Sequence, residues 1–94
     1  MKVGVLTLVL RLPDAGSLKE KRSILHGLIA AVSRRGPAFA AAEVGDLDAH
    51  NRATIRIAHL SNDPRYTDAA LRRLQAKLED GRGYLVEEAR LEIL

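Results

Sequence analysis

Residues 3–22 read VGVLTLVLRLPDAGSLKEKR, and the fold prediction depends on this stretch. In the first half, Val3 to Leu12, leucine occupies every second position from residue 6 onwards, which is typical of a β-strand with one buried face. The turn cluster Pro13 to Gly16 ends that strand. Ser17 and Glu20 then form a capping box, in which each side chain satisfies a free backbone amide. The sequence therefore predicts a strand followed closely by a helix.

The first helix is predicted over residues 18–35. It ends in Arg34 and Arg35, two cations at the negative end of the helix dipole, followed by Gly36 and Pro37. An apolar stripe at helical spacing is expected to face the core. It consists of Leu18, Leu25, Leu28 and Val32, flanked by Ile24 and Ile29.

The rest of the chain is predicted to hold three strands and one more helix. Residues 53–60 alternate and contain β-branched side chains, so they are expected to pair as a hairpin with the Ala-rich segment 38–44. Asp63 and Pro64 are an N-cap and a first-turn proline, which predicts a second helix over 64–80. Residues 84–93 alternate and are predicted to form the last strand.

The order of these elements is β-α-β-β-α-β. With right-handed crossovers this order predicts an α+β, ferredoxin-like sandwich, in which two helices cover one face of a four-stranded antiparallel sheet. Ninety-four residues are enough for one domain, so residues 1–94 are treated as a single unit.

The composition excludes several classes of protein. Apolar residues make up 47% of the chain, which is too much for a disordered protein. There is no cysteine, so disulfides and thiolate chemistry are excluded. No apolar run reaches membrane-spanning length, and the start does not read as a signal peptide. We therefore expect a soluble, cytoplasmic protein.

One face of the predicted sheet has no helix to cover it. The residues expected there are too apolar to be left comfortably in water, which favours self-association, most simply as a homodimer. A partly solvated antiparallel sheet is the alternative. The residues expected on this face are Val5, Thr7, Val9, Ala58, Leu60, Tyr84 and Val86.

The first helix begins with an unusual group of cations. Lys19, Lys21 and Arg22 lie where the helix dipole is already positive, which is unfavourable unless something negative binds there. Together with the free amides of the first turn they are candidates for binding phosphate or an RNA backbone. Lys21 falls within the apolar stripe, so the competing interpretation is a structural ion pair, with Glu43 as partner.

Recognition of RNA through its phosphates is the lead functional hypothesis. Arg34 and Arg35 are expected to contribute more weakly than the cations at the start of the helix. The chain has only three aromatic residues and none on the central strands, so base stacking on the sheet is disfavoured. Recognition is therefore expected to depend on backbone charge and shape.

No catalytic motif is recognisable in the sequence. Glu43, Asp46, Asp48 and His50 could ligate a divalent metal in a hydrolase, but acidic residues are ordinary in such a loop. His26 and His59 have no sequence neighbour that would make either a general base. We expect a protein that is not an enzyme, with no catalytic residue, no metal and no cofactor.

Several short stretches of the sequence together form a recognisable pattern, and they are Val3–Leu8, Ser17–Arg22, Ala41–Val44, Ala53, Thr54 and Ser61–Asp63. In these stretches, and along essentially its whole length, the chain resembles the YlxP family of small bacterial proteins of unknown function. The resemblance implies a ferredoxin-like fold and a genomic setting beside genes for transcription elongation, translation initiation and ribosome maturation. The loop 49–52 departs from the family pattern, which often has an aromatic followed by Gln.

These observations lead to two functional hypotheses. The first is a non-enzymatic, oligomeric binding protein that associates with RNA or the ribosome through its basic first helix. The alternative is a regulatory module in which the sheet faces of two subunits pair and bind a small anion at the interface.

Overall fold

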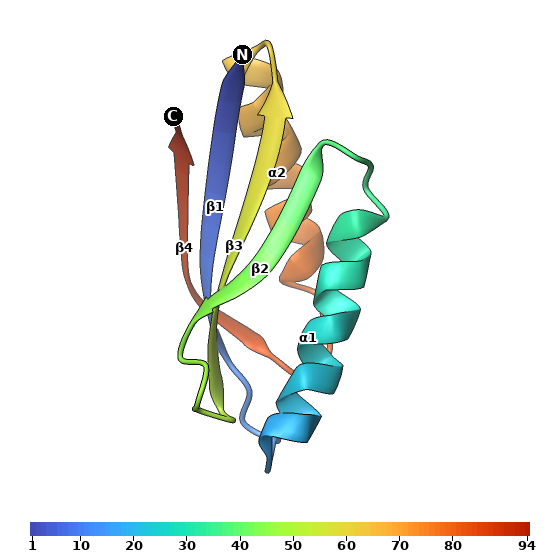
Figure 1. Cartoon of the computed structure of the whole chain (residues 1–94), viewed down its shortest axis with the longest axis vertical. Coiled ribbons are helices and arrows are strands. Elements are labelled where there is room, and N and C mark those ends of the chain that lie inside the picture. The colour runs from blue at the N-terminus through green and yellow to red at the C-terminus, as the bar shows by residue number, and fades with distance from the viewer.

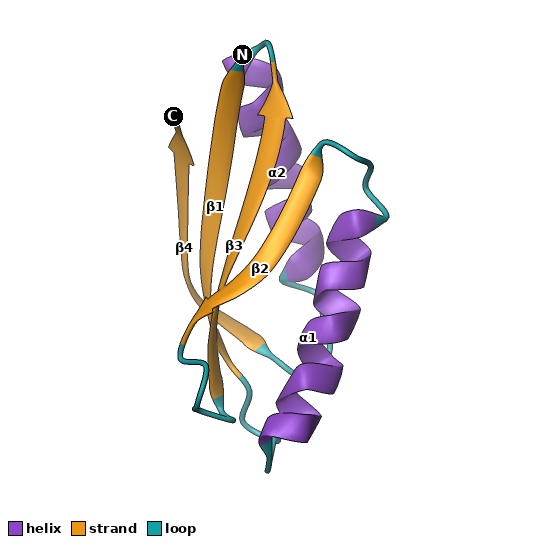
Figure 2. Ribbon diagram, in the orientation of Figure 1, coloured by secondary structure: helices purple, strands orange, loops and turns teal.

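The structure, a computed structural model, describes residues 1–94 and contains six elements in the predicted order (Figure 1). The strands are β1 (Lys2–Arg11), β2 (Phe39–Gly45), β3 (Arg52–Ser61) and β4 (Leu85–Ile93). The helices are α1 (Leu18–Ser33) and α2 (Pro64–Leu78). The four strands form one antiparallel sheet in the order β2-β3-β1-β4, so the first strand is central (Figure 2). The predicted α+β fold is confirmed.

The caps of both helices follow the sequence signals. The Ser17 hydroxyl accepts a hydrogen bond from the Glu20 amide at 3.1 Å, and the Glu20 carboxylate accepts one from the Gly16 amide at 3.0 Å. The Asp63 carboxylate accepts from the Arg65 amide at 2.9 Å. Each helix ends two residues before its predicted end, because the residues that follow form tighter turns, in which an amide bonds to the carbonyl three residues earlier, as Arg35 does to Val32 and Asp80 to Lys77. Neither helix has the length and apolarity needed to span a membrane.

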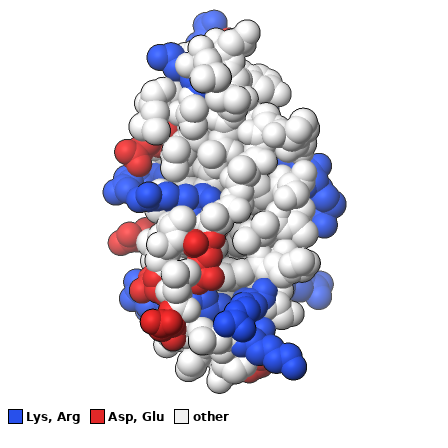
Figure 3. Space-filling model, in the orientation of Figure 1, with Lys and Arg blue, Asp and Glu red and all other residues white.

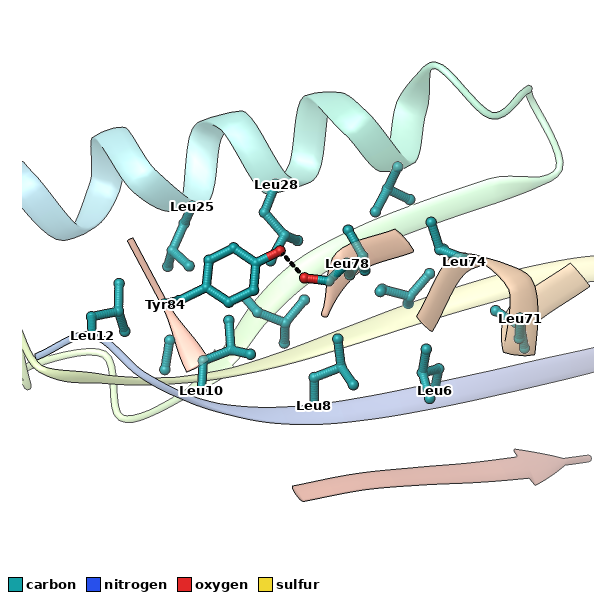
Figure 4. Packing of buried hydrophobic residues seen from close by; sticks show 14 of the residues in the cluster. Leu6, Leu8, Leu10, Leu12, Leu25, Leu28, Leu71, Leu74, Leu78 and Tyr84 are labelled. Carbon is teal, nitrogen blue, oxygen red and sulfur yellow. Dashed lines mark hydrogen bonds between the residues drawn. The ribbon is translucent and has the colours of Figure 1, made fainter. Parts of the chain in front are cut away.

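The core lies between the sheet and the two helices (Figure 4). The leucines at every second position of the first strand segment are fully buried, as the alternation predicts. They meet one stripe from each helix, and burial of each such side chain stabilises the fold by about 1.5–3 kcal/mol. The buried side chains are Leu6, Leu8, Leu10 and Leu12, with Leu25, Leu28 and Val32 from α1 and Thr67, Leu71, Leu74 and Leu78 from α2.

The prediction that Tyr84 and Val86 lie on the uncovered face is wrong. Val9 pairs with Glu88 but Leu10 pairs with Val86, so Glu87 is an extra residue in β4. Such a β-bulge reverses the alternation for the residues that precede it. Val86 packs against the core instead, and Tyr84 is buried there with its hydroxyl donating to the Leu78 carbonyl, as Figure 4 shows.

Two glycines allow a matched test of the packing. A Cβ on Gly4 would overlap Thr67 Cγ2 and Leu71 Cδ1, whereas one on Gly27, in α1, would meet nothing within 4 Å. Gly4→Ala should lower the free energy of unfolding by about 1–3 kcal/mol, because the core would be overpacked. Gly27→Ala should raise it by about 1 kcal/mol, because alanine is the better helix former. Urea denaturation measures both, and equal effects would contradict the packing described.

Candidate functional site

Lys21 is buried within the core-facing stripe of α1, with 1% of its surface exposed. Its ammonium donates hydrogen bonds to the carbonyls of Asp46 at 2.7 Å and Ala49 at 2.6 Å, and forms an ion pair with Glu43 Oε2 at 2.6 Å. The two carbonyls accept hydrogen bonds from two of the three ammonium donors, and the Glu43 carboxylate neutralises the charge. The predicted ion pair with Glu43 is confirmed. The competing prediction, that Lys21 binds an external anion, stays a prediction, and the ion pair with Glu43 already neutralises the charge that it would need.

The same network engages the loop between β2 and β3. Asp46 adopts a positive φ of 59°, and its carboxylate accepts a hydrogen bond from the Thr54 hydroxyl at 3.2 Å. A ring nitrogen of His50 (Nδ1) lies 2.7 Å from the Ala15 carbonyl. The acidic and histidine side chains considered above as metal ligands do not converge, and no group of three or more such side chains could hold a metal ion.

The other predicted anion-binding residues divide into two groups along α1. Lys19 and Arg22 are exposed near the start of the helix and form no ion pair. Arg34 and Arg35 are exposed just beyond its end. Twelve residues separate Arg22 from Arg34, which corresponds to about 18 Å along a helix. The structure therefore does not bring these four residues together.

Arg34 and Arg35 instead meet cations of the second helix across a groove. This groove, of about 520 Å³, lies between α1 and α2, and its floor includes Leu28, Leu78 and Tyr84. It is continuous with two shallower hollows that share Arg35 and Arg73. We call the cations that line these three hollows the groove cations; they are Arg34, Arg35, Arg73, Lys77 and Arg82.

The groove cations lack counterions within the protein. None of the five has a carboxylate within 4.0 Å, and Asp80 is the one acidic residue among the lining side chains. By contrast, Arg72, which precedes Arg73 on α2, is paired with Asp68 at 2.9 Å. Five unpaired positive charges around one groove create a local positive potential that attracts polyanions.

Two aromatic rings lie at one end of the groove. Phe39 and Tyr66 line a hollow of about 340 Å³ together with Arg34, Arg35 and Arg73. The ring of His59 lies between them, 4.6 Å from the Phe39 centroid and 5.7 Å from that of Tyr66. Sequence reasoning missed this pairing because it considered aromatics on the sheet alone. The sequence did contain a signal, because Tyr66 lies on the predicted second helix among several arginines. In the structure Tyr66 is 58% exposed.

A closed hydroxyl and imidazole network lies beneath these rings. His59 Nδ1 is 3.0 Å from the Thr67 hydroxyl, which is 2.6 Å from the Ser61 hydroxyl. His59 is 2% exposed and Thr67 is fully buried, whereas Ser61 at the edge of the cluster is half-buried. Burial lowers the pKa of His59 below its ordinary value of 6.5, because desolvation disfavours the charged imidazolium.

The sheet face away from the helices is uncovered, as predicted. Figure 3 shows this face with α1 at its right, and it has a broad uncharged area in its upper and middle part, with charged side chains at the top, along both sides and in the lower part. Val3, Val5, Ala58 and Leu60 lie in facing positions there, and Leu60 is 47% exposed. The self-association expected from this face stays a prediction.

Residues 3–90 match the model of a family described as "Protein of unknown function (DUF503)". The chain belongs to the DUF503 family. No curated protein matches it.

The role of Lys21 in this DUF503 chain can be tested by removing its charge. Lys21→Met keeps the length of the side chain but leaves Glu43 and two carbonyls without their partner. The free energy of unfolding should fall by about 3 kcal/mol, the lower end of the usual loss when one member of a buried pair is removed. Lys19→Met, the same change at an exposed position, should stay within about 0.5 kcal/mol of the wild type. Guanidinium denaturation compares them; equal stability of the two variants would contradict the structural role.

His59 should make the stability depend on pH. The unfolded chain takes up a proton on His59 as the pH falls through 6.5, whereas the folded chain, with its lowered pKa, resists protonation. The contribution of His59 to the free energy of unfolding should therefore be complete above pH 6.5 and decrease as the pH drops below that value. In His59→Asn the decrease between pH 7.5 and 5.5 should be smaller, and in the exposed control His26→Asn it should persist. An unchanged decrease in His59→Asn would contradict this assignment.

Proposed function

We propose that this DUF503 protein is a non-enzymatic RNA-binding protein that holds a single-stranded or looped segment along the groove between α1 and α2. The observation that carries the proposal is the set of five groove cations without internal counterions. Phosphates of a nucleic-acid backbone supply a row of negative charges, and their neutralisation releases condensed counterions, which favours binding.

The aromatic end of the groove favours single-stranded RNA over a duplex. An unstacked base can lie on the exposed Tyr66 ring, while Arg34, Arg35 and Arg73 bind the phosphates beside it. Bases in a duplex are stacked on one another and do not reach such a ring. The proposal therefore replaces pure backbone recognition, expected from the sequence, with backbone recognition plus stacking.

Two further observations support the proposal. Lys19 and Arg22 form no ion pair and lie farther along α1, where they extend the positive surface as peripheral contacts. The resemblance to the YlxP family implies a genomic setting beside genes for ribosome maturation. By analogy with that setting, we propose that the bound RNA is ribosomal RNA. His59 and Thr67, which form a hydrogen-bonded network with Ser61, are buried and do not line the groove.

The proposal can be tested by fluorescence anisotropy with a labelled oligouridine. Affinity should fall steeply with salt, and each neutralising change, Arg34→Gln, Arg73→Gln or Lys77→Gln, should weaken binding several-fold and reduce the salt slope by about 0.7. Arg72→Gln should leave the affinity unchanged, because Arg72 is paired with Asp68 and does not line the groove. Tyr66→Ala should weaken single-stranded RNA more than duplex RNA.

Two outcomes would contradict this function. Absence of binding at low salt, or binding that does not respond to salt, would exclude phosphate recognition. Equal losses in Arg72→Gln and Arg73→Gln would mean that overall charge, and not the groove, determines the affinity.

A further inference from the structure

Thr7 has a hydroxyl with no hydrogen-bond partner on the face opposite to the groove. It lies at the middle of the central strand β1, and its partners across β3 and β4 show that it points away from the helices. Although that face has no second layer, Thr7 is 8% exposed, and its Oγ1 is buried without a partner. A buried hydroxyl that makes no hydrogen bond costs about 1–3 kcal/mol, so an unused donor at this position needs an explanation.

Two arginines flank this hydroxyl. Thr7 pairs with Arg56 on β3 and with Arg90 on β4, so the three side chains form one row across the sheet. The backbones of the two arginines are two strand spacings apart, about 10 Å, and their long side chains can close over Thr7. Nothing in the row itself balances their positive charges.

The arginines of this row differ in their ion pairs from Arg11 and Arg52, which pair with each other across the strands at the C-terminal end of β1. Arg11 and Arg52 share Glu87, which lies 2.7 Å and 3.5 Å from their guanidinium nitrogens. Arg56 has no carboxylate within 4.0 Å, and Arg90 reaches Glu92 only at 3.5 Å with a side chain that is 65% exposed. Arg56 is thus free to bind an anion, and the solvent-exposed contact of Arg90 with Glu92 can be exchanged for one.

A shallow pocket of about 550 Å³ lies over this row, within the size range of small-ligand sites. Val9 and Thr54 form one side of it, and Glu88 supplies the one acidic side chain of the lining. The Thr54 hydroxyl already donates to Asp46, so Thr7 provides the free hydroxyl donor.

We propose that this pocket binds a phosphate group, either as inorganic phosphate or as a small phosphomonoester. The two guanidinium groups hold the phosphate oxygens from both sides, in the bidentate geometry that arginine favours. The Thr7 hydroxyl donates to a third oxygen, which satisfies the buried group. In a phosphomonoester, Glu88 accepts a hydrogen bond from a hydroxyl of the organic part. The site lies on the sheet face and is independent of the RNA groove.

The substitution Thr7→Val separates this proposal from a purely structural role. It keeps the branched shape but removes the hydroxyl. Without ligand the variant should unfold at a higher temperature than the wild type, because an unsatisfied polar group is lost. With phosphate its affinity should be at least tenfold weaker, the effect expected when one hydrogen bond to a charged group is removed. Ser23→Ala is the control, since it removes an exposed hydroxyl of α1 that does not line this pocket, and it should keep the affinity.

The measurement is a titration followed by ¹H–¹⁵N NMR, with inorganic phosphate and glycerol 3-phosphate in separate experiments. Saturable shifts are expected at Thr7, Arg56 and Arg90, and they should be lost in Arg56→Gln. Tighter binding of glycerol 3-phosphate would identify the ester as the ligand class, and tighter binding of inorganic phosphate would identify the free ion. The proposal is overturned if neither ion gives saturable shifts in this row, if Thr7→Val binds as well as the wild type, or if Thr7→Val lowers the melting temperature. Arg34→Gln, in the groove, should leave these shifts unchanged.

Discussion

A four-stranded sheet has two faces, and this chain has helices for only one of them. The leucines of β1 require burial, and α1 and α2 supply the apolar stripes that cover them. Every other feature depends on that asymmetry. The helical layer carries the groove cations on its outer side, and the uncovered sheet face carries a row in which Thr7 lies between two arginines. Both proposed anion sites therefore follow from the fact that the two helices cover only one face of the sheet.

Tyr84 forms part of the floor of the groove between the helices. Its ring lies between the leucines of α1 and the end of α2, and its hydroxyl is satisfied by the Leu78 carbonyl (Figure 4). The small residues Gly27 and Ala31 on α1 also line the groove. None of the groove cations has a carboxylate within 4.0 Å, so their charge is available to a phosphate backbone.

Lys21 shows that a cation at the beginning of a helix need not serve a ligand. Its position near the positive end of the dipole is unfavourable by a few tenths of a kcal/mol to about 1 kcal/mol, and burial adds a desolvation cost. Glu43 and the carbonyls of Asp46 and Ala49 offset both. The result is a polar tie between α1 and the loop between β2 and β3, in a place where leucine would leave those carbonyls without a donor.

The sequence by itself determined the order of the elements, the caps at Ser17 and Asp63, the buried face of β1 and the partner of Lys21. These depend on local periodicity, on backbone amides within one turn of a capping side chain, and on the rule that a buried cation needs an acid. Tertiary structure decided the bulge at Glu87, because the apolar positions change from even (Tyr84, Val86) to odd (Ala89, Leu91) in the sequence, but only the pairing with β1 shows that both sets face the core. It also decided which cations share a surface. Arg34 and Arg82 are far apart in sequence, and Thr7, Arg56 and Arg90 come from three strands, so only the packing of helices and the register of the sheet bring their charges together.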